Sequence, residues 1–226
     1  MKTISFISQK GGTGKTTLAL NVATEAMRRG LTVAIIDLDP QPSATAWSEL
    51  RTKSNDPPVL DAKASRLSPA VAMAAKQGLD LLIVDTGGRT DEGAFAAAKA
   101  SDLVVIPIQP SAIDLKSMDA TRELIDRAGR PASIVVLTRV KPFGTRHEEI
   151  AAGLNAGGCT VCPITIGDRV SFQDAYAVGQ TVAEYEAGGK AMQEIQQLYM
   201  YICEHVDMTS ARSEDNGETA RSVRTG

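Results

Sequence analysis

The sequence predicts an α/β protein with a doubly wound, mostly parallel sheet that carries helices on both faces. Short apolar runs of strand length alternate with helical segments along the chain, which is the pattern of right-handed βαβ units. Two of these runs, residues 31–37 and 79–85, are almost continuously apolar, as expected for strands that are covered on both faces. A chain of 226 residues suits one domain, and an aromatic content of 4% indicates an aliphatic core.

Composition excludes several classes of protein. No run approaches the roughly 18–20 apolar residues of a membrane span, and the chain enters a strand so early that we expect no signal peptide. The three cysteines suit a reducing compartment, so we expect a cytoplasmic protein. The net charge is −3, so any contact with nucleic acid must come from a local basic patch, or from a patch that dimerisation doubles.

In the first half of the chain, the helix opened by Lys15 ends at Arg28-Arg29-Gly30, where cations and a glycine are typical of a helix C-terminus. Ser43 is expected to cap a short helix that reaches Leu50, and Gly78 ends an alanine-rich helix. The remaining expected elements, in order, are a strand at 4–7, a strand at 31–37, a polar loop at 51–58, a strand at 59–62, a helix at 67–77 and a strand at 79–85.

The second half continues the alternation. We expect helices at 91–100, 113–128, 148–155 and 169–177, strands at 103–108, 133–138 and 160–164, and a basic loop at 139–146. A last helix follows Gly188-Gly189, because Ala191, Ile195, Leu198, Ile202 and Val206 mark one apolar stripe. Residues 207–226 hold little to bury and are expected to form a disordered polar tail, which leaves 1–206 as the folded domain.

A glycine-rich stretch at residues 9–17 reads Q-K-G-G-T-G-K-T-T and lies between the first strand and the first helix. Such a turn aims backbone N–H groups and the positive end of a helix at one point, where phosphates bind. Lys15 would neutralise β- and γ-phosphate oxygens, Thr16 would ligate Mg²⁺, and Thr17 can reach the α-phosphate. The cofactors implied are ATP and Mg²⁺.

This stretch resembles the deviant Walker A motif K-G-G-x-G-K-T-T of the ParA/MinD family of P-loop ATPases. The resemblance covers about residues 2–206 and includes the segments 37–41, 102–107, 137–139 and 182–185. It implies an ATPase with a weak intrinsic rate that forms a homodimer with ATP. Many relatives have Asp-x-Pro-Pro after the fourth strand, where this chain has Asp85-Thr86-Gly87-Gly88.

Phosphoryl transfer to water needs a phosphate cradle, Mg²⁺, a group that orients the water and positive charge on the transition state. We assign Asp85, with Thr16, to the metal and Asp39 to the attacking water. Resemblance implies that Lys10 reaches the partner's phosphates across the dimer, so Lys10, Lys15 and Asp39 are the expected catalytic residues. The expected nucleotide-binding residues are Gly11, Gly12, Thr13, Gly14, Lys15, Thr16, Thr17, Asp37, Thr138 and Arg139.

The family includes partition ATPases that bind DNA without sequence preference and are released by a small adaptor protein. Candidate DNA contacts are cations in the second half, namely Arg139, Lys141, Arg146, Arg169 and Lys190. Resemblance also places Thr138 and Arg139 beside the nucleotide base, so Arg139 has two possible roles. Other members bind membranes through an amphipathic tail, but this tail offers only Met208 and Val223 as large apolar residues, so we expect no membrane binding.

Two alternatives stay open: a ParA-like positioner of a protein cargo, and an ATP-dependent metabolic ligase of related fold. A ligase needs a pocket for its acceptor substrate, and we find no extra carboxylate or histidine cluster to build one; His147 and His205 are isolated in the sequence. Cys159 and Cys162 form a C-x-x-C motif, and the sequence has one further cysteine, Cys203. We expect these residues to be buried structural thiols, since strand residues three apart point to opposite faces.

Overall fold

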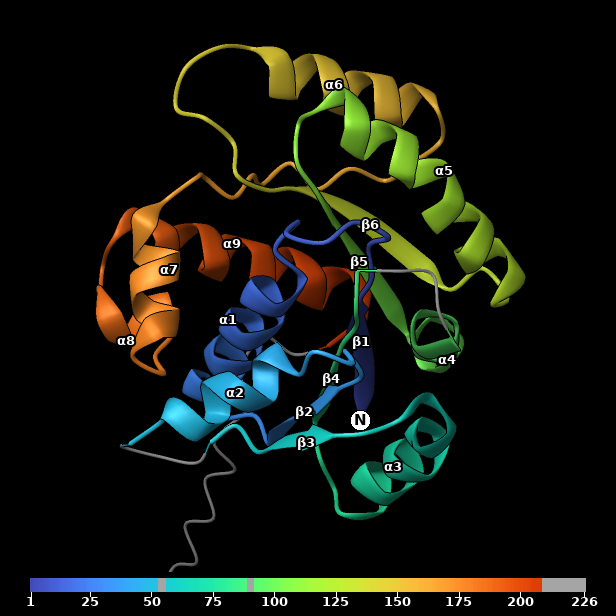
Figure 1. The fold of residues 1–226 in the computed structure, drawn as a ribbon, viewed down its shortest axis with the longest axis vertical. Helices are drawn as coiled ribbons and strands as arrows, with labels where there is room; N and C mark the ends of the chain where they lie inside the picture. Colours follow the sequence, from blue (N-terminus) through green and yellow to red (C-terminus); the bar gives the residue numbers. More distant parts are fainter. Residues whose placement is uncertain (53–55, 89–91, 209–226) are drawn as a thin grey trace, which may run out of the picture.

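The computed structural model describes residues 1–52, 56–88 and 92–208. These residues form three layers, in which one parallel sheet lies between two layers of helices (Figure 1). Within these residues the sheet has six strands in the order β3-β2-β4-β1-β5-β6, and every pairing is parallel. The strands are β1 (Lys2–Phe6), β2 (Val33–Asp37), β3 (Val59–Asp61), β4 (Leu81–Asp85), β5 (Leu103–Ile108) and β6 (Ala132–Leu137). The predicted fold class is confirmed.

Helices cover both faces of this sheet. They are α1 (Lys15–Arg28), α2 (Ser43–Leu50), α3 (Ala64–Lys76), α4 (Glu92–Ala100), α5 (Ala112–Arg127), α6 (Arg146–Ala156), α7 (Val170–Ala177), α8 (Val182–Tyr185) and α9 (Lys190–His205). α1, α2 and α7 to α9 pack on one face, and α3 to α6 pack on the other (Figure 1). The strands are therefore apolar on both sides: Ile83 of β4 faces the first group of helices, and its neighbour Val84 faces the second.

The order of strands also fixes where a ligand can bind. The chain starts at β1 and builds β2, β3 and β4 on one side of it, then β5 and β6 on the other. Parallel strands end at the same edge of the sheet, so the segments after β1, β2, β4 and β6 meet there. In sheets of this kind the ligand crevice lies outside those carboxyl ends, at the point where the strand order reverses.

The prediction of a strand at 160–164 is wrong. Val161 makes a single parallel bridge to Val135 of β6, in which the Val135 amide donates to the Thr160 carbonyl and the Cys162 amide donates to the Val135 carbonyl. In a continued parallel ladder the Ile164 amide would donate next, to the Leu137 carbonyl, but that carbonyl accepts from the Ile166 amide instead, so the regular pairing ends after Cys162. The segment therefore runs along the edge of the sheet without forming a strand.

Smaller differences concern helix ends. Ser43 is the first residue of α2 rather than its cap, and the side chain of Asp37 accepts hydrogen bonds at that end instead. The short helix α8, which precedes α9, was not indicated by the sequence pattern. It begins with a Thr181–Glu184 capping box. Of the expected tail, Met208 packs against the core. Residues 209–226 lie outside the described part of the chain.

Candidate nucleotide-binding site

The glycine-rich loop between β1 and α1 depends on two residues with positive φ. Gly12 has φ of 77° and Gly14, which directly precedes α1, has φ of 100°, a region that side chains rarely adopt. Two neighbouring strand ends hold the loop in place. The Gln109 side-chain amide donates to the Gly12 carbonyl (2.9 Å), and the Thr138 hydroxyl donates to the Thr13 carbonyl (2.7 Å). The loop therefore presents a helix N-terminus, where an anion binds favourably.

A large cavity of about 930 Å³ opens in front of this loop. Its volume lies at the upper end of the range for small-molecule sites. Lining residues come from the glycine-rich loop and α1 (Gly11, Gly12, Gly14, Lys15, Thr16, Thr17, Leu18), from the segment after β2 (Asp39, Pro40, Gln41, Ser43), from Gly87 and Gly88, and from Thr138, Arg139, Ile166, Gly167, Asp168, Arg169, Phe172, Gln173 and Tyr176. The structure thus brings most of the predicted nucleotide-binding residues together.

Lys15 is the buried cation of the site. Burial lowers the pKa of its ammonium, and the carboxylates of Asp85 and Asp39 act in the opposite direction. The Nζ atom donates to the Lys10 carbonyl at 3.1 Å, across the base of the loop. A charge held in a buried position by a neutral carbonyl interacts more strongly with an anion than an exposed lysine does, because less water screens it.

Asp85, at the end of β4, is completely buried, and neither of its carboxylate oxygens has a hydrogen-bond partner of acceptable geometry in the described structure. Burial raises the pKa of Asp85 to about 7, although the nearby Thr16 hydroxyl partly offsets this rise. A buried carboxylate without partners is costly, so the position suits a cation. Mg²⁺ typically binds one or two protein oxygens together with phosphate oxygens, and Thr16 and Asp85 fit that arrangement.

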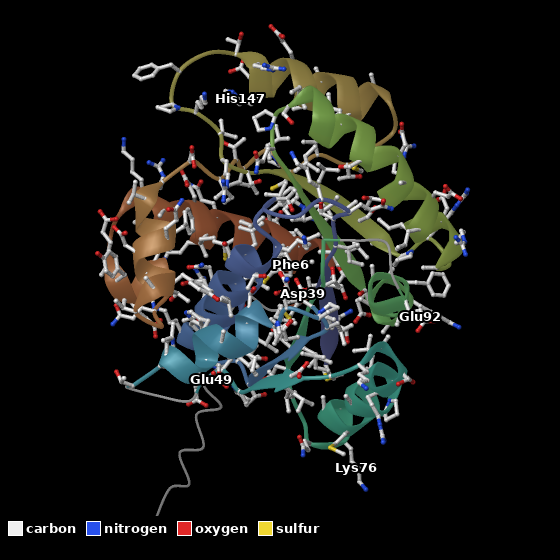
Figure 2. The ribbon with its side chains drawn as sticks, viewed as in Figure 1. Phe6, Asp39, Glu49, Lys76, Glu92 and His147 are labelled. Carbon is white, nitrogen blue, oxygen red and sulfur yellow. The ribbon has the colours of Figure 1, made fainter. Side chains whose placement is uncertain are left out.

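The two aspartates after β2 have different surroundings. Asp37 is buried, and its Oδ2 accepts hydrogen bonds from the Ala44 and Thr45 amides at the start of α2 (2.9 and 3.1 Å). Asp39 lines the cavity, where its Oδ1 accepts from the Gln41 amide at 2.9 Å. Asp39 lies near the centre of the molecule, as Figure 2 shows. Asp37 therefore holds the segment that carries Asp39, and its expected role as a direct nucleotide ligand stays a prediction.

The segment after β4 packs between these two loops. A Cβ atom on Gly87 would lie 3.3 Å from Asp39 Oδ1, and a Cβ atom on Gly88 would lie 2.8 Å from the Gly11 nitrogen. Contact this close is possible only for glycine at position 88, because the neighbouring atoms belong to backbone. Gly87 and Gly88 thus connect the phosphate-binding loop to the segment that carries Asp39.

The far end of the cavity is formed by two adjacent segments. Thr138 is buried beside the glycine-rich loop, and Arg139, with φ of 50°, lines the cavity next to it. A parallel bridge joins Val140 to Gly167. Resemblance implied a position beside the nucleotide base for Thr138 and Arg139, and their place in the cavity is compatible with that role.

Arg169 was a candidate DNA contact, but its side chain is engaged within the chain. The guanidinium forms a salt bridge with Glu194 of α9, and Glu194 also accepts from the Gly167 amide at 3.1 Å. Arg169 lines the cavity as well. Its contacts therefore favour a role in shaping the far wall of the cavity over a role on the outer surface.

Sequence reasoning missed the wall that α7 contributes, namely Phe172, Gln173 and Tyr176. The Tyr176 hydroxyl donates to the Ser43 carbonyl at 2.8 Å and so joins α7 to α2. No motif marks these residues, because their place depends on how distant segments pack. The spacing of Phe172 and Tyr176, four positions apart on one helix, was the one available indication that they share a face.

The other predicted residues lie around the site. Lys10 is half-buried and is not among the residues that line the cavity, so its expected reach into a partner is untested in a single chain. Thr13 is buried beneath the loop. The side chains of Lys141, Arg146 and Lys190 are exposed, as a surface contact requires.

The cysteines behave as structural residues. All three thiols are free; Cys162 and Cys203 are buried, whereas Cys159 is only half-buried, which differs from our expectation. Burial raises the pKa of Cys162 to about 11, so its reactive thiolate is scarce at neutral pH. Within the described residues, no cluster of three or more His, Cys, Asp or Glu side chains could hold a metal ion. In the same part of the chain, no helix is long and apolar enough to cross a bilayer.

Together, the parallel sheet, the glycine-rich loop and the buried Lys15 and Asp85 define a P-loop nucleotide-binding protein. The chain matches the CobQ/CobB/MinD/ParA nucleotide binding domain over residues 4–182 and belongs to that family. Protein IncC from Escherichia coli is 30% identical over an alignment that covers 89% of this chain and 69% of that protein. The maintenance of carboxysome distribution protein A of Gloeobacter kilaueensis is 29% identical over 91% of this chain and 94% of its own length.

A solved structure supports the fold. The crystal structure of a candidate plasmid partition protein from Borrelia burgdorferi, bound to AMPPNP, superimposes with a TM-score of 0.71. The match covers 90% of this chain and 98% of that one, at 18% sequence identity. The arrangement of strands and helices is therefore shared with a protein whose structure was solved with a nucleotide analogue bound.

Proposed function

We propose that this protein is a Mg²⁺-dependent ATPase that dimerises on ATP, binds DNA without sequence preference and thereby partitions a plasmid or chromosome. A small adaptor protein would stimulate hydrolysis and release the ATPase from DNA. The observation that carries the proposal is that Lys15, Thr16 and Asp39 line one cavity, and that the buried Asp85 carboxylate behind it interacts with both Thr16 and Lys15.

Each of these groups has a task in ATP hydrolysis. Lys15 and the amides of the glycine-rich loop bind and orient the phosphates, because a buried ammonium and a helix N-terminus both favour negative charge. Thr16 and Asp85 would hold Mg²⁺, which would supply charge neutralisation at the phosphates. Asp39 orients the attacking water, since its carboxylate is exposed to the cavity. With a single orienting carboxylate in this role, we expect slow turnover.

Lys10 supplies the argument for a dimer. Its carbonyl accepts from the Lys15 Nζ, and Lys10 itself is not among the residues that line the cavity of its own chain. A lysine in this position is suited to bridging toward a second copy, where it would place positive charge on the partner's phosphates as an arginine finger does. Dimerisation would then depend on ATP.

DNA binding by an acidic chain requires a local surface. Exposed Lys141, Arg146 and Lys190, with Arg139 nearby in sequence, are the cations available for phosphate contacts. Two copies would double this patch, and release of counterions from DNA would supply the affinity. We place the protein in the cytoplasm, associated with the nucleoid when ATP is bound.

A second candidate function is the positioning of a protein cargo. The relative from Gloeobacter is named for carboxysome distribution, and its sequence is almost as similar to this chain as that of IncC. We propose the same nucleotide site for both functions, so they differ in the partner rather than in the site. A metabolic ligase of related fold has less support, because the lining residues that the structure describes add no histidine and, besides Asp39, only Asp168 as a carboxylate.

The test is a filter-binding titration of the protein on two unrelated duplexes, at several salt concentrations, with ATP and with ADP. We expect tight binding with ATP only, equal on both duplexes and falling steeply with salt. Lys15→Ala should bind neither nucleotide nor DNA, whereas Lys76→Ala, at an exposed site on the distant α3 (Figure 2), should behave as wild type. Equal or absent DNA binding in both nucleotide states, with ATPase activity intact, would reject DNA partition.

A further inference from the structure

The loop between β6 and α6 carries an unusually exposed aromatic residue. Phe143 is 89% exposed, more than any other large hydrophobic side chain in the described residues. A single exposed apolar residue is ordinary and needs no explanation on its own. Phe143 differs in its setting, because exposed Lys141 precedes it by two positions and exposed Arg146 follows it by three.

The two ends of this loop are anchored, so its tip has a defined direction. Val140 is buried, its amide donates to the Ile166 carbonyl, and its carbonyl accepts from the Asp168 amide, both at 3.0 Å. At the other end the loop leads into α6, which packs on the core through the buried Leu154. Figure 1 shows the loop extending at the edge of the molecule, above α7.

The base of the loop also lies against the nucleotide cavity. Arg139 lines that cavity directly before the anchored Val140, and Gly167, which forms the bridge to Val140, lines it too. A nucleotide that contacts Arg139 or Gly167 therefore touches the support of the loop. The position of the tip can thus respond to the bound nucleotide.

We propose that Phe143 is a DNA contact that inserts its ring between base steps while Lys141 and Arg146 bind the flanking phosphates. Apolar wedges of this kind are used by proteins that bind DNA with little sequence preference, since a phenyl ring reads no hydrogen-bonding edge. The cations on both sides favour a polyanion over an apolar protein surface. Glu148 and Glu149 in the first turn of α6 oppose this charge, and we therefore expect contact through the tip and not along the helix. The inference rests on the DNA-binding function proposed above.

The salt dependence of binding separates the ring from the cations. Phe143→Ala should weaken ATP-dependent binding to a mixed-sequence duplex about five- to tenfold, toward the low end for the loss of one base-stacking aromatic. The slope of log affinity against log salt should not change, because no charge is lost. Lys141→Ala should instead lower that slope by about one. Met73→Ala, an equally conservative loss of an exposed apolar side chain on α3, should change neither quantity.

A fluorescent variant gives a direct readout in the full chain. The protein has one tryptophan, Trp47, which is fully buried, so Phe143→Trp adds the sole exposed indole. We expect duplex DNA with ATP and Mg²⁺ to protect this indole from acrylamide quenching, and DNA with ADP to leave it unprotected. Basal ATPase activity should remain as in wild type.

The possible failures are distinguishable. If wild type binds DNA with ATP but Phe143→Ala binds equally well, the role of Phe143 is overturned and the proposed function stands. If wild type does not bind DNA, both are overturned. Protection of Phe143→Trp by anionic vesicles but not by DNA would assign the tip to a membrane surface, and loss of dimerisation in Phe143→Ala would assign it to the interface between copies; either result overturns the proposal.

Discussion

The backbone of Gly88 lies so close to Gly11 that a Cβ atom at position 88 would be 2.8 Å from the Gly11 nitrogen and 2.9 Å from its Cα. The segment after β4 is thus packed directly on the phosphate-binding loop. A Cβ atom on the neighbouring Gly87 would lie 3.3 Å from the side-chain Oδ1 of Asp39. Any residue other than glycine at position 88 would bring its Cβ atom against backbone atoms of Gly11 and Lys10, so this packing requires glycine.

Gly88→Ala is therefore expected to disturb the phosphate-binding loop. Either the loop or the segment after β4 must shift, at a cost of about 1–3 kcal/mol, and we expect nucleotide affinity to fall by at least tenfold. Calorimetric titration with ATP and thermal unfolding measure the two effects. Gly153→Ala in α6 is the matched control, since a Cβ there meets nothing within 4 Å. Normal ATP affinity in Gly88→Ala would show that the loop accommodates the added methyl group.

Lys10 and Asp39 should give opposite phenotypes. Lys10→Ala should bind ATP and remain monomeric, because the charge expected to cross to the partner is lost. Asp39→Ala should dimerise with ATP and fail to hydrolyse it, because the water is no longer oriented. Light scattering and phosphate release measure both properties. A Lys10→Ala protein that dimerises and hydrolyses ATP normally would remove Lys10 from the mechanism.

Glu194 on α9 is expected to position the far wall of the cavity without touching the reacting groups. It holds both Arg169 and the Gly167 amide, and both of those residues line the cavity. Glu194→Gln should raise KM for ATP several-fold and leave kcat nearly unchanged, since the phosphate end of the site is intact. Glu204→Gln, an exposed position on the same helix, is the control. A fall in kcat with unchanged KM would contradict this assignment.

Asp85 should make the stability of the nucleotide-free protein depend on pH. Its pKa is about 7 in the folded protein and 3.8 ordinarily, so between these values the folded protein keeps a proton that the unfolded chain has lost. The free energy of unfolding therefore decreases as pH rises from about 4 to 7, by up to about 4 kcal/mol, and is then constant. Thermal unfolding with a chelator present measures this trend.

Asp85→Asn removes the titrating group and should flatten the trend, leaving the smaller contribution from Asp37, whose pKa burial also raises. The variant should be more stable than wild type at pH 8 and should lose Mg²⁺-dependent ATPase activity. Identical pH profiles for the two proteins would show that Asp85 is not held protonated in the folded state.

The sequence by itself determined the fold class and the centre of the site. Apolar runs of strand length that end at Asp37 and Asp85 indicate buried parallel strands, because strands covered on both faces are almost continuously apolar. The K-G-G-T-G-K-T-T stretch identifies the phosphate-binding loop, because its glycines, lysine and threonines act within one short segment. Each of these features is formed by residues that are adjacent in the sequence, so a local pattern is enough to identify it.

Tertiary structure decided the features that join distant segments. The α7 wall, the Arg169–Glu194 pair and the closeness of Gly88 to Gly11 all bring together residues far apart in the chain, and no local pattern marks such contacts. It also decided between strand and loop at 160–164, where the apolar residues run along the sheet edge but the Leu137 carbonyl accepts from the Ile166 amide, out of register with the bridge at Val161. The pattern of apolar residues in the sequence predicts which residues are buried. Which distant residues they contact depends on how the helices and strands pack together.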